Sequence, residues 1–258
     1  MEKIRLITLF SGYDSQALAM ERLKRDFGAQ FDYELVAWCE IDEMSIHAHN
    51  ALFPQCADRN VGDICKVRPE ELPDCDVITW SFPCQAISVA GKQEGLKEGS
   101  GTTSSLAWEC MNIFQAKKPK FLLMENVKAL TQQKFMPDFM RLQKELEDMG
   151  YTNFWQVLNA KDFGVPQNRE RVFMVSVLGD AAFEFPKPFP LEKRLRDVLE
   201  DNVGESYYLK DEQVARILEH TELHKKRGNG FTHNFQDRGG GLVEQSLQPM
   251  EEDQRTHL

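Results

Sequence analysis

One thiol and two carboxylates occupy positions where they could do chemistry together. Cys84 directly follows Pro83, just beyond an apolar run that is typical of a buried strand. Glu40 and Glu125 each follow a comparable run. A cysteine at the C-terminal end of a strand is where an α/β protein presents a nucleophile, and a nearby carboxyl group can hold or donate a proton. The set therefore predicts a nucleophilic active site rather than a structural cysteine.

A glycine turn and an acid indicate a nucleoside site beside it. Gly12 follows the first apolar run, where it permits a tight turn and lets a ligand approach the backbone closely. Glu40 ends the second run, where a carboxylate can accept hydrogen bonds from ribose hydroxyls. In residues 61–64, Asp63 could accept a hydrogen bond from an adenine amine, and Ile64 could pack on the ring. We therefore expect an adenosine-containing cofactor.

The segments that carry these residues alternate between strand and helix. The expected strands are Ile4–Phe10, Tyr33–Trp38, Asp74–Trp80, Lys120–Met124, Asn153–Leu158 and Arg171–Val177. The expected helices are Ser15–Phe27, Glu43–Leu52, Leu106–Ala116, Lys134–Met149 and Lys210–Lys226. This order predicts an α/β fold, a doubly wound and mostly parallel sheet covered by helices on both faces. The C-terminal ends of its strands would bring the glycine, the acids and the thiol to one edge.

The regular alternation stops near Gly179, and a proline-punctuated segment, 185–190, follows it. We expect residues 1–190 to form the catalytic domain. Residues 191–258 would form a short C-terminal appendage that includes a glycine-rich stretch at 228–241.

Composition limits the other possibilities. The chain of 258 residues, 41% of them hydrophobic, can bury one sizeable core. Its six cysteines include no CxxC pair, so neither a disulfide scaffold nor a zinc site is expected. No apolar run approaches a membrane span and no signal peptide precedes the first strand, which predicts a cytoplasmic protein without membrane contact. The net charge of −10 still allows nucleic acid to bind in a local positive cleft.

From about Leu6 to Val177, the order of these motifs resembles the C5-cytosine-specific DNA methyltransferase family. The motifs that carry the resemblance are Leu9-Phe10-Ser11-Gly12, Glu40-Ile41-Asp42, Gly62-Asp63-Ile64, Phe82-Pro83-Cys84-Gln85, Ser105-Leu106-Ala107-Trp108-Glu109, Glu125-Asn126-Val127 and Gln167-Asn168-Arg169-Glu170-Arg171-Val172-Phe173. The resemblance implies a Rossmann-like methyltransferase fold. It also implies transfer of a methyl group from S-adenosylmethionine to C5 of cytosine in double-stranded DNA.

Catalytic roles follow from the resemblance. Cys84 would add to C6 of a flipped-out cytosine, and Glu125 would bind or protonate the ring N3. Arg169 would contact the base's carbonyl oxygen or a DNA phosphate, and Arg171 would be a structural or phosphate partner.

The resemblance also implies a cofactor site and a lid. The residues expected to contact the cofactor are Phe10, Ser11, Gly12, Glu40, Ile41, Asp63, Ile64, Pro83 and Leu106. The polar, glycine-containing segment 86–105 resembles the family's mobile loop that closes over DNA, and an ordinary connection is the alternative.

Two departures from the family pattern leave alternatives open. Asp14 and Ser15 stand where the cofactor turn usually carries further glycines, and Asp14 could lie near the cationic sulfonium. The family's last motifs are not found. Residues 207–231 resemble the opening of a recognition region, and the basic stretch 224–230 within them is suited to phosphate contact. The alternatives are a truncated or split methyltransferase subunit, an inert cofactor-binding homologue, and the same chemistry on RNA. A complementing chain and a cognate restriction endonuclease are the candidate protein partners.

Overall fold

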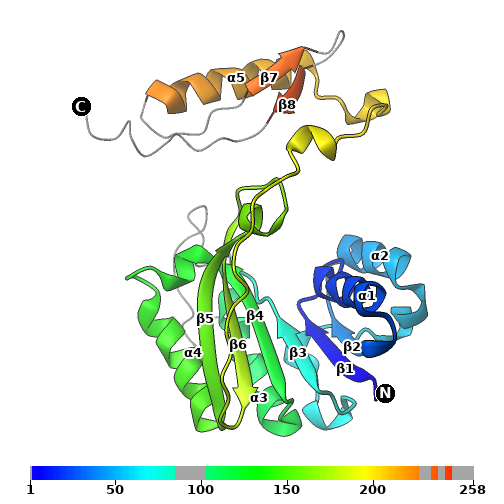
Figure 1. The fold of residues 1–258 in the computed structure, drawn as a ribbon, viewed down its shortest axis with the longest axis vertical. Coiled ribbons are helices and arrows are strands. Elements are labelled where there is room, and N and C mark those ends of the chain that lie inside the picture. The colour runs from blue at the N-terminus through cyan, green and yellow to red at the C-terminus, as the bar shows by residue number, and fades with distance from the viewer. Residues whose placement is uncertain (1, 85–102, 227–233, 238–241, 246–258) are drawn as a thin grey trace. The chain divides into compact units, whose positions relative to one another are not determined.

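The computed structural model describes residues 2–84, 103–226, 234–237 and 242–245, which form two compact units (Figure 1). The first unit contains residues 1–158 and 170–185, and the second contains 159–169 and 186–258. This division differs from a single boundary near Pro190, because the loop 159–169 groups with the second unit. Within that unit, the Phe189 N–H donates to the Asp162 carbonyl at 3.0 Å, and Phe189 packs edge-on against Phe163.

A six-stranded sheet forms the centre of the first unit, with strand order β2-β1-β3-β4-β6-β5 (Figure 1). Its strands are β1 (Ile4–Leu9), β2 (Tyr33–Cys39), β3 (Val77–Trp80), β4 (Phe121–Val127), β5 (Tyr151–Asn159) and β6 (Glu170–Leu178). Its helices are α1 (Ser15–Phe27), α2 (Glu43–Leu52), α3 (Glu109–Lys117) and α4 (Met136–Asp148).

Strands β1 to β4 pair in parallel, whereas β6 runs antiparallel to β4. Two consecutive parallel strands need a long crossover connection, usually through a helix. The chain between β5 and β6 contains only a short 3-10 turn, Ala160–Phe163, so β6 returns in the opposite direction. The expected doubly wound, mostly parallel α/β sheet is confirmed, with the direction of β6 as its exception.

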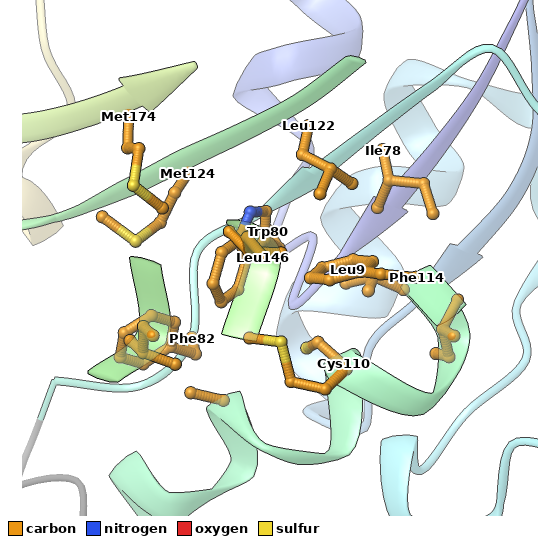
Figure 2. Packing of buried hydrophobic residues seen from close by; sticks show 14 of the residues in the cluster. Leu9, Ile78, Trp80, Phe82, Cys110, Phe114, Leu122, Met124, Leu146 and Met174 are labelled. Atoms are coloured by element: carbon orange, nitrogen blue, oxygen red, sulfur yellow. The ribbon is translucent and has the colours of Figure 1, made fainter. Parts of the chain in front are cut away.

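Helices cover both faces of the sheet because successive side chains of a strand point to opposite sides. On one face, Leu9 and Trp80 pack with residues of α3 and α4, including Phe114 and Phe139. Figure 2 shows Trp80 near Phe114, whose ring meets it edge-on at 5.1 Å. On the other face, Leu6 packs with Ala17 of α1 and with other residues of a smaller cluster. This layering fixes the sheet edge that carries the candidate site.

A β-bulge in β2 alters which side chains face the second cluster. The partner of Leu6 is Leu35, but the partner of Ile7 is Ala37, so one extra residue of β2 is accommodated. A bulge re-aims the side chains that follow it. Here Trp38 packs in the smaller cluster with Leu35, although the two residues are three positions apart.

The second unit contains helix α5 (Asp211–Lys226) and two short antiparallel strands, β7 (Asn234–Asp237) and β8 (Leu242–Gln245). Except for residues 103–105, the segment expected to form a mobile loop lies outside the described residues, as do most of the glycine-rich stretch and the acidic end of the chain. Among the described helices, none combines the length and the apolar character that a membrane span requires.

Candidate active site

One row of paired residues crosses the sheet and determines where the site lies. Leu9 of β1 pairs with Cys39 of β2 and with Trp80 of β3, and Trp80 pairs with Met124 of β4. Because these four strands are parallel, the residues that follow this row emerge at one sheet edge. The segments that begin at Phe10, Glu40, Ser81 and Glu125 therefore lie along the same edge.

The turn after β1 is a left-handed backbone turn that Ser11 ties to β2. Phe10 and Gly12 both have φ of +57°, which glycine tolerates and a bulky residue rarely adopts. The Ser11 N–H donates to the Cys39 carbonyl at 3.0 Å. A Cβ added to Gly12 would meet no atom within 4 Å, so the space beside this backbone is open.

Glu40 joins this turn to the start of α2. Its Oε2 accepts a hydrogen bond from the Gly12 N–H at 2.9 Å, and its Oε1 accepts from the N–H groups of Ile41 at 2.8 Å and Asp42 at 2.9 Å. A carboxylate has about four lone-pair sites, so Oε2 can accept one more hydrogen bond. The side chain of Ile41 is 67% exposed and offers an apolar surface beside it.

Asn60 links Glu40 to the third turn. Its Oδ1 accepts from the N–H groups of Glu40 at 3.2 Å and Gly62 at 3.0 Å, and its Nδ2 donates to the Glu40 carbonyl at 3.1 Å. Asp63 follows and accepts from the Cys65 N–H at 3.1 Å. That backbone hydrogen bond, together with nearby Lys66, lowers the pKa of Asp63, so this carboxylate is charged at neutral pH.

Two predicted cofactor contacts lie deeper than their neighbours on this edge. Ile64 is only 6% exposed and belongs to the main core, so Ile41 presents far more apolar surface to a ligand. Leu106 is half-buried against the same core and lies in a 3-10 turn, Thr103–Ala107, rather than in the α-helix expected to begin there.

The segment that carries the thiol is anchored immediately before it. Phe82 is 2% exposed and packs against Trp80 at a centroid distance of 5.5 Å (Figure 2). The buried Asn126 of β4 donates from Nδ2 to the Phe82 carbonyl at 3.1 Å. Cys84 follows two residues later as a half-buried free thiol. Its position is therefore set by the core and by one hydrogen bond from the neighbouring strand.

Glu125 and Arg171 form an ion pair on adjacent antiparallel strands. The Arg171 Nε lies 3.1 Å from Glu125 Oε1, and the two side chains are 23% and 26% exposed. Arg171 is also oriented by its own strand, since its Nη1 donates to the Glu170 carbonyl at 2.8 Å. The pair places a carboxyl group and a guanidinium charge together at the edge where Cys84 lies.

Arg169 belongs to the second unit, in the loop 159–169. Its N–H donates to Asn159 Oδ1 at 3.0 Å, and its carbonyl accepts from the Ala160 N–H at 3.1 Å. Asn159 also donates to Asn168 Oδ1 at 2.7 Å, so one asparagine organises the backbone of the basic motif. Arg171, two residues later in β6, belongs to the first unit and pairs there with Glu125.

The other buried cysteines are poorly suited to attack. Burial raises the pKa of the Cys39 and Cys75 thiols to about 12 and raises that of Cys110 well above its usual value. A thiol reacts as the thiolate, so these three groups are inert at neutral pH. Cys65 is exposed, and Cys84 is the half-buried cysteine.

The family model for C-5 cytosine-specific DNA methylases matches residues 4–256. The chain belongs to this family. The resemblance predicted from the motifs is therefore confirmed.

Curated relatives agree with this assignment. The chain is 52% identical over 159 residues to the type II methyltransferase M2.ScrFI of Lactococcus lactis subsp. cremoris, covering 61% of this chain and 44% of that protein. It is 35% identical over 222 residues to the type II methyltransferase M.HaeII of Haemophilus aegyptius, covering 84% and 65%. The orphan methyltransferase M.Rho11sI of Bacillus phage rho11s is 29% identical over 258 residues, with coverage of 88% and 50%. The chain spans about half the length of these relatives.

Solved structures share the fold. The S. pombe Dnmt2 methyltransferase gives a TM-score of 0.63 at 20% identity, covering 85% of this chain and 66% of that one. A putative DNA modification methyltransferase encoded in an E. coli prophage gives 0.57 at 24% identity, covering 81% and 56%.

The residues at this sheet edge fit a nucleoside cofactor of the S-adenosylmethionine type. The open space beside Gly12 admits a ligand against the backbone, and Glu40 is held with one acceptor site left for a hydroxyl. The exposed Ile41 can cover one face of a ring. These features suit a nucleoside better than a phosphate, because the groups around Gly12 are carboxylates rather than cations. Among the described residues, no group of three or more His, Cys, Asp or Glu side chains could hold a metal ion.

Sequence reasoning missed several residues that support the methylase site. Asn60 and Asn126 had no assigned role, although each holds a backbone carbonyl or N–H of a predicted motif. An asparagine directly beside a motif is a signal that could have found them, because its amide can accept and donate at once. Asp14 does not face a ligand, since its side chain is fully buried.

Proposed function

We propose that this chain binds S-adenosylmethionine and transfers its methyl group to C5 of cytosine in double-stranded DNA. Membership of the C-5 cytosine-specific DNA methylase family supports this proposal. The main support is the row of paired residues Cys39, Leu9, Trp80 and Met124. This row brings the Gly12 and Glu40 turns to the sheet edge where Cys84 and Glu125 lie.

The chemistry explains why a thiol and an acid are needed. Cytosine C5 is a poor nucleophile. Addition of the Cys84 thiolate to C6 forms a C–S bond and displaces the C5=C6 electron pair, which makes C5 nucleophilic. Glu125 donates a hydrogen bond or proton to N3, which makes C6 more electrophilic. When bound, S-adenosylmethionine supplies the electrophilic methyl group. The donor would leave as S-adenosylhomocysteine. Transfer of the C5 proton to water then lets the C5–H electron pair re-form the C5=C6 bond, and the C–S pair leaves on sulfur as the thiolate.

Arg171 positions Glu125 in this proposal through their ion pair. Its ion pair with Glu125 is partly exposed, so an incoming base can exchange for solvent there without burying an unpaired charge. Arg169, in the loop organised by Asn159, serves DNA phosphate. The cytosine must leave the base stack to reach Cys84.

The proposed cofactor contacts are the residues predicted from the sequence, and their exposure indicates which of them contribute most. The set is Phe10, Ser11, Gly12, Glu40, Ile41, Asp63, Ile64, Pro83 and Leu106. Glu40 binds ribose hydroxyls, Asp63 accepts from the adenine amine, and Ile41 carries most of the apolar contact because Ile64 is buried.

Protein partners and location complete the proposal. We expect a cytoplasmic modification enzyme whose candidate partners are a cognate restriction endonuclease and a complementing chain. An inert homologue is not favoured, because Cys84, Glu125 and Arg171 are all present at the sheet edge. Residues 1–190 form the catalytic domain in this proposal, and 191–258 form part of the recognition region.

The test is methyl transfer from labelled S-adenosylmethionine to mixed-sequence duplex DNA, with transfer RNA in a parallel reaction. The parent chain is compared with Cys84→Ser and with a control variant, Cys65→Ser, which removes an exposed thiol. Label at C5 of cytosine with the parent and Cys65→Ser, and none with Cys84→Ser, is expected. Label only on RNA would show that RNA rather than DNA is the substrate. Equal label with Cys84→Ser would show that Cys84 is not the nucleophile.

A second measurement traps the covalent step. Cytosine with fluorine at C5 cannot lose that substituent after methyl transfer, so the parent should remain attached to such DNA. A folded parent that binds the cofactor but neither labels nor traps DNA would contradict activity of this chain alone.

A further inference from the structure

A buried polar cluster lies behind the cofactor turn, and the proposed mechanism uses none of it. Asp14 and His49 come from opposite ends of α1 and α2, and both side chains are 0% exposed. Asp14 stands where the related family turn usually carries a glycine. A buried carboxylate is costly unless hydrogen bonds or a cation compensate it, so its surroundings need an explanation.

Asp14 closes the turn through four hydrogen bonds. Its Oδ1 caps α1 by accepting from the Ala17 N–H at 2.9 Å, and its Oδ2 accepts from the Thr8 hydroxyl at 2.7 Å. Its N–H donates to the Ser11 carbonyl at 2.8 Å, and its own carbonyl accepts from the Leu18 N–H at 3.1 Å. Asp14 therefore connects β1, the turn and the first turn of α1.

His49 faces the same carboxylate from α2. Its Nε2 lies 3.7 Å from Asp14 Oδ2, which is too long for a hydrogen bond but close enough for attraction between charges or dipoles. The ring stacks on Trp38 at a centroid distance of 3.6 Å, and the Trp38 indole N–H is fixed by the Cys56 carbonyl at 2.7 Å. The bulge in β2 brings Trp38 to this face, so Trp38 also helps to position His49.

The cofactor turn needs such support because its backbone is strained. Phe10, Gly12 and Asp14 all have positive φ, so three of five successive residues are left-handed. Non-glycine residues in this region cost roughly 1–2 kcal/mol each and persist only where the surroundings hold them. The Ser11 hydroxyl also lies 2.9 Å from the Thr8 hydroxyl, which links the same network to the turn.

We propose that Asp14 is a positioning residue that, with Thr8 and His49, fixes the Phe10–Gly12 turn in the shape that binds S-adenosylmethionine. This inference rests on the proposed function. Asp14 acts through Thr8 and the turn backbone and does not contact the cofactor. A glycine at position 14 would not restore a family-like turn in this chain, because the Thr8 hydroxyl and the Ala17 N–H would lose their acceptors.

The first test compares equilibrium binding of S-adenosylmethionine to the full chain and to Asp14→Asn and Asp14→Gly. Asparagine keeps the shape and one cap acceptor but loses the charge and the second acceptor. We expect Kd to rise about tenfold in Asp14→Asn and further in Asp14→Gly, with kcat at saturating cofactor within about twofold of the parent.

Tyr33→Phe is the matched control. The Tyr33 hydroxyl anchors α1 through the Ala17 carbonyl at 3.2 Å and Glu21 at 2.8 Å, without contacting the turn. Its loss should lower the melting temperature and leave Kd unchanged. An equal loss of affinity in Tyr33→Phe would show that Asp14 acts only through the stability of α1, and would overturn the inference.

A double-mutant cycle tests the link to His49. His49→Phe keeps an aromatic ring against Trp38 and removes the ring nitrogens. We expect it to raise Kd in the parent and to have a smaller effect in the Asp14→Asn background. Additive effects would remove His49 from the proposal. A parent that binds no S-adenosylmethionine would instead contradict the proposed function, whereas a parent that binds it as tightly as Asp14→Asn would contradict only this inference.

Discussion

Two parts of the same sheet edge hold their charges in different ways. On the cofactor side, residues 10–14 and 40–42, the Glu40 and Asp14 carboxylates accept hydrogen bonds from backbone N–H groups that belong to the fold. On the nucleophile side, residues 82–84, 125–127 and 170–171, Glu125 forms an ion pair with the partly exposed side chain of Arg171. A carboxylate held by backbone is suited to binding, because its geometry cannot relax. A carboxyl group held by a side chain can exchange partners with a substrate, which chemistry requires.

The largest effect that this comparison predicts is on the rate constant. Glu125→Gln keeps the shape of the side chain but cannot supply a proton to N3. We expect kcat to fall about hundredfold or more, with the Kd for S-adenosylmethionine unchanged, as single-turnover methylation and cofactor titration would measure. Glu145→Gln, which breaks an exposed pair with Arg141 on α4, should leave both values unchanged. A loss of cofactor affinity with an unchanged kcat would contradict the assignment of Glu125 to the chemical step.

A smaller effect is predicted on cofactor binding. Glu40→Gln replaces one acceptor oxygen by an amide NH₂ and removes the charge that three backbone N–H groups hold. We expect the Kd for S-adenosylmethionine to rise about ten- to thirtyfold, with kcat unchanged at saturation. Glu43→Gln, three residues later in the exposed first turn of α2, is the control. If kcat falls as much as affinity, the two sides of the edge are not separable.

The nucleophile side also depends on one buried amide. Asn126→Ala removes the donor to the Phe82 carbonyl, two residues before Cys84. We expect unfolding to become easier by about 1–3 kcal/mol and kcat to fall about tenfold or less. Asn153→Ala is the control, because it removes a similar side-chain hydrogen bond, from Asn153 to the Gln143 carbonyl, in a segment that carries none of the predicted site residues. It should lower stability without lowering kcat, as denaturant unfolding and turnover would show.

The smallest effect concerns the thiols. Since burial raises the pKa of Cys39 and Cys75 to about 12, alkylation at pH near 8 should label Cys84 and Cys65 and spare these two. Folding favours the protonated thiols, so their contribution to stability is complete below pH 9.0 and is lost as the pH rises toward about 12. Peptide mapping of native and unfolded protein measures the labels. Equal labelling of Cys39 in the native protein would contradict this burial.

Sequence periodicity located the elements well where local signals were strong. The helices Ser15–Phe27 and Glu43–Leu52 match the prediction because an aspartate caps each start. The helix expected at Leu106 begins instead at Glu109, after a 3-10 turn, because periodicity does not distinguish these two windings. The strand expected to end at Met124 continues to Val127, since pairing with β6 extends it.

The amino-acid sequence alone predicted the family and the α/β class, and it singled out the thiol, the two acids and the glycine turn as candidate site residues. These properties depend on residue types in order, which a chain states directly. The folded chain was needed to show that β6 runs antiparallel, that Arg171 pairs with Glu125, and that Ile64 is buried while Ile41 is exposed. It also decided that Asp14 and His49 meet in the core. Such relations join segments far apart in the chain, and pairing and packing across the sheet create them rather than any local preference.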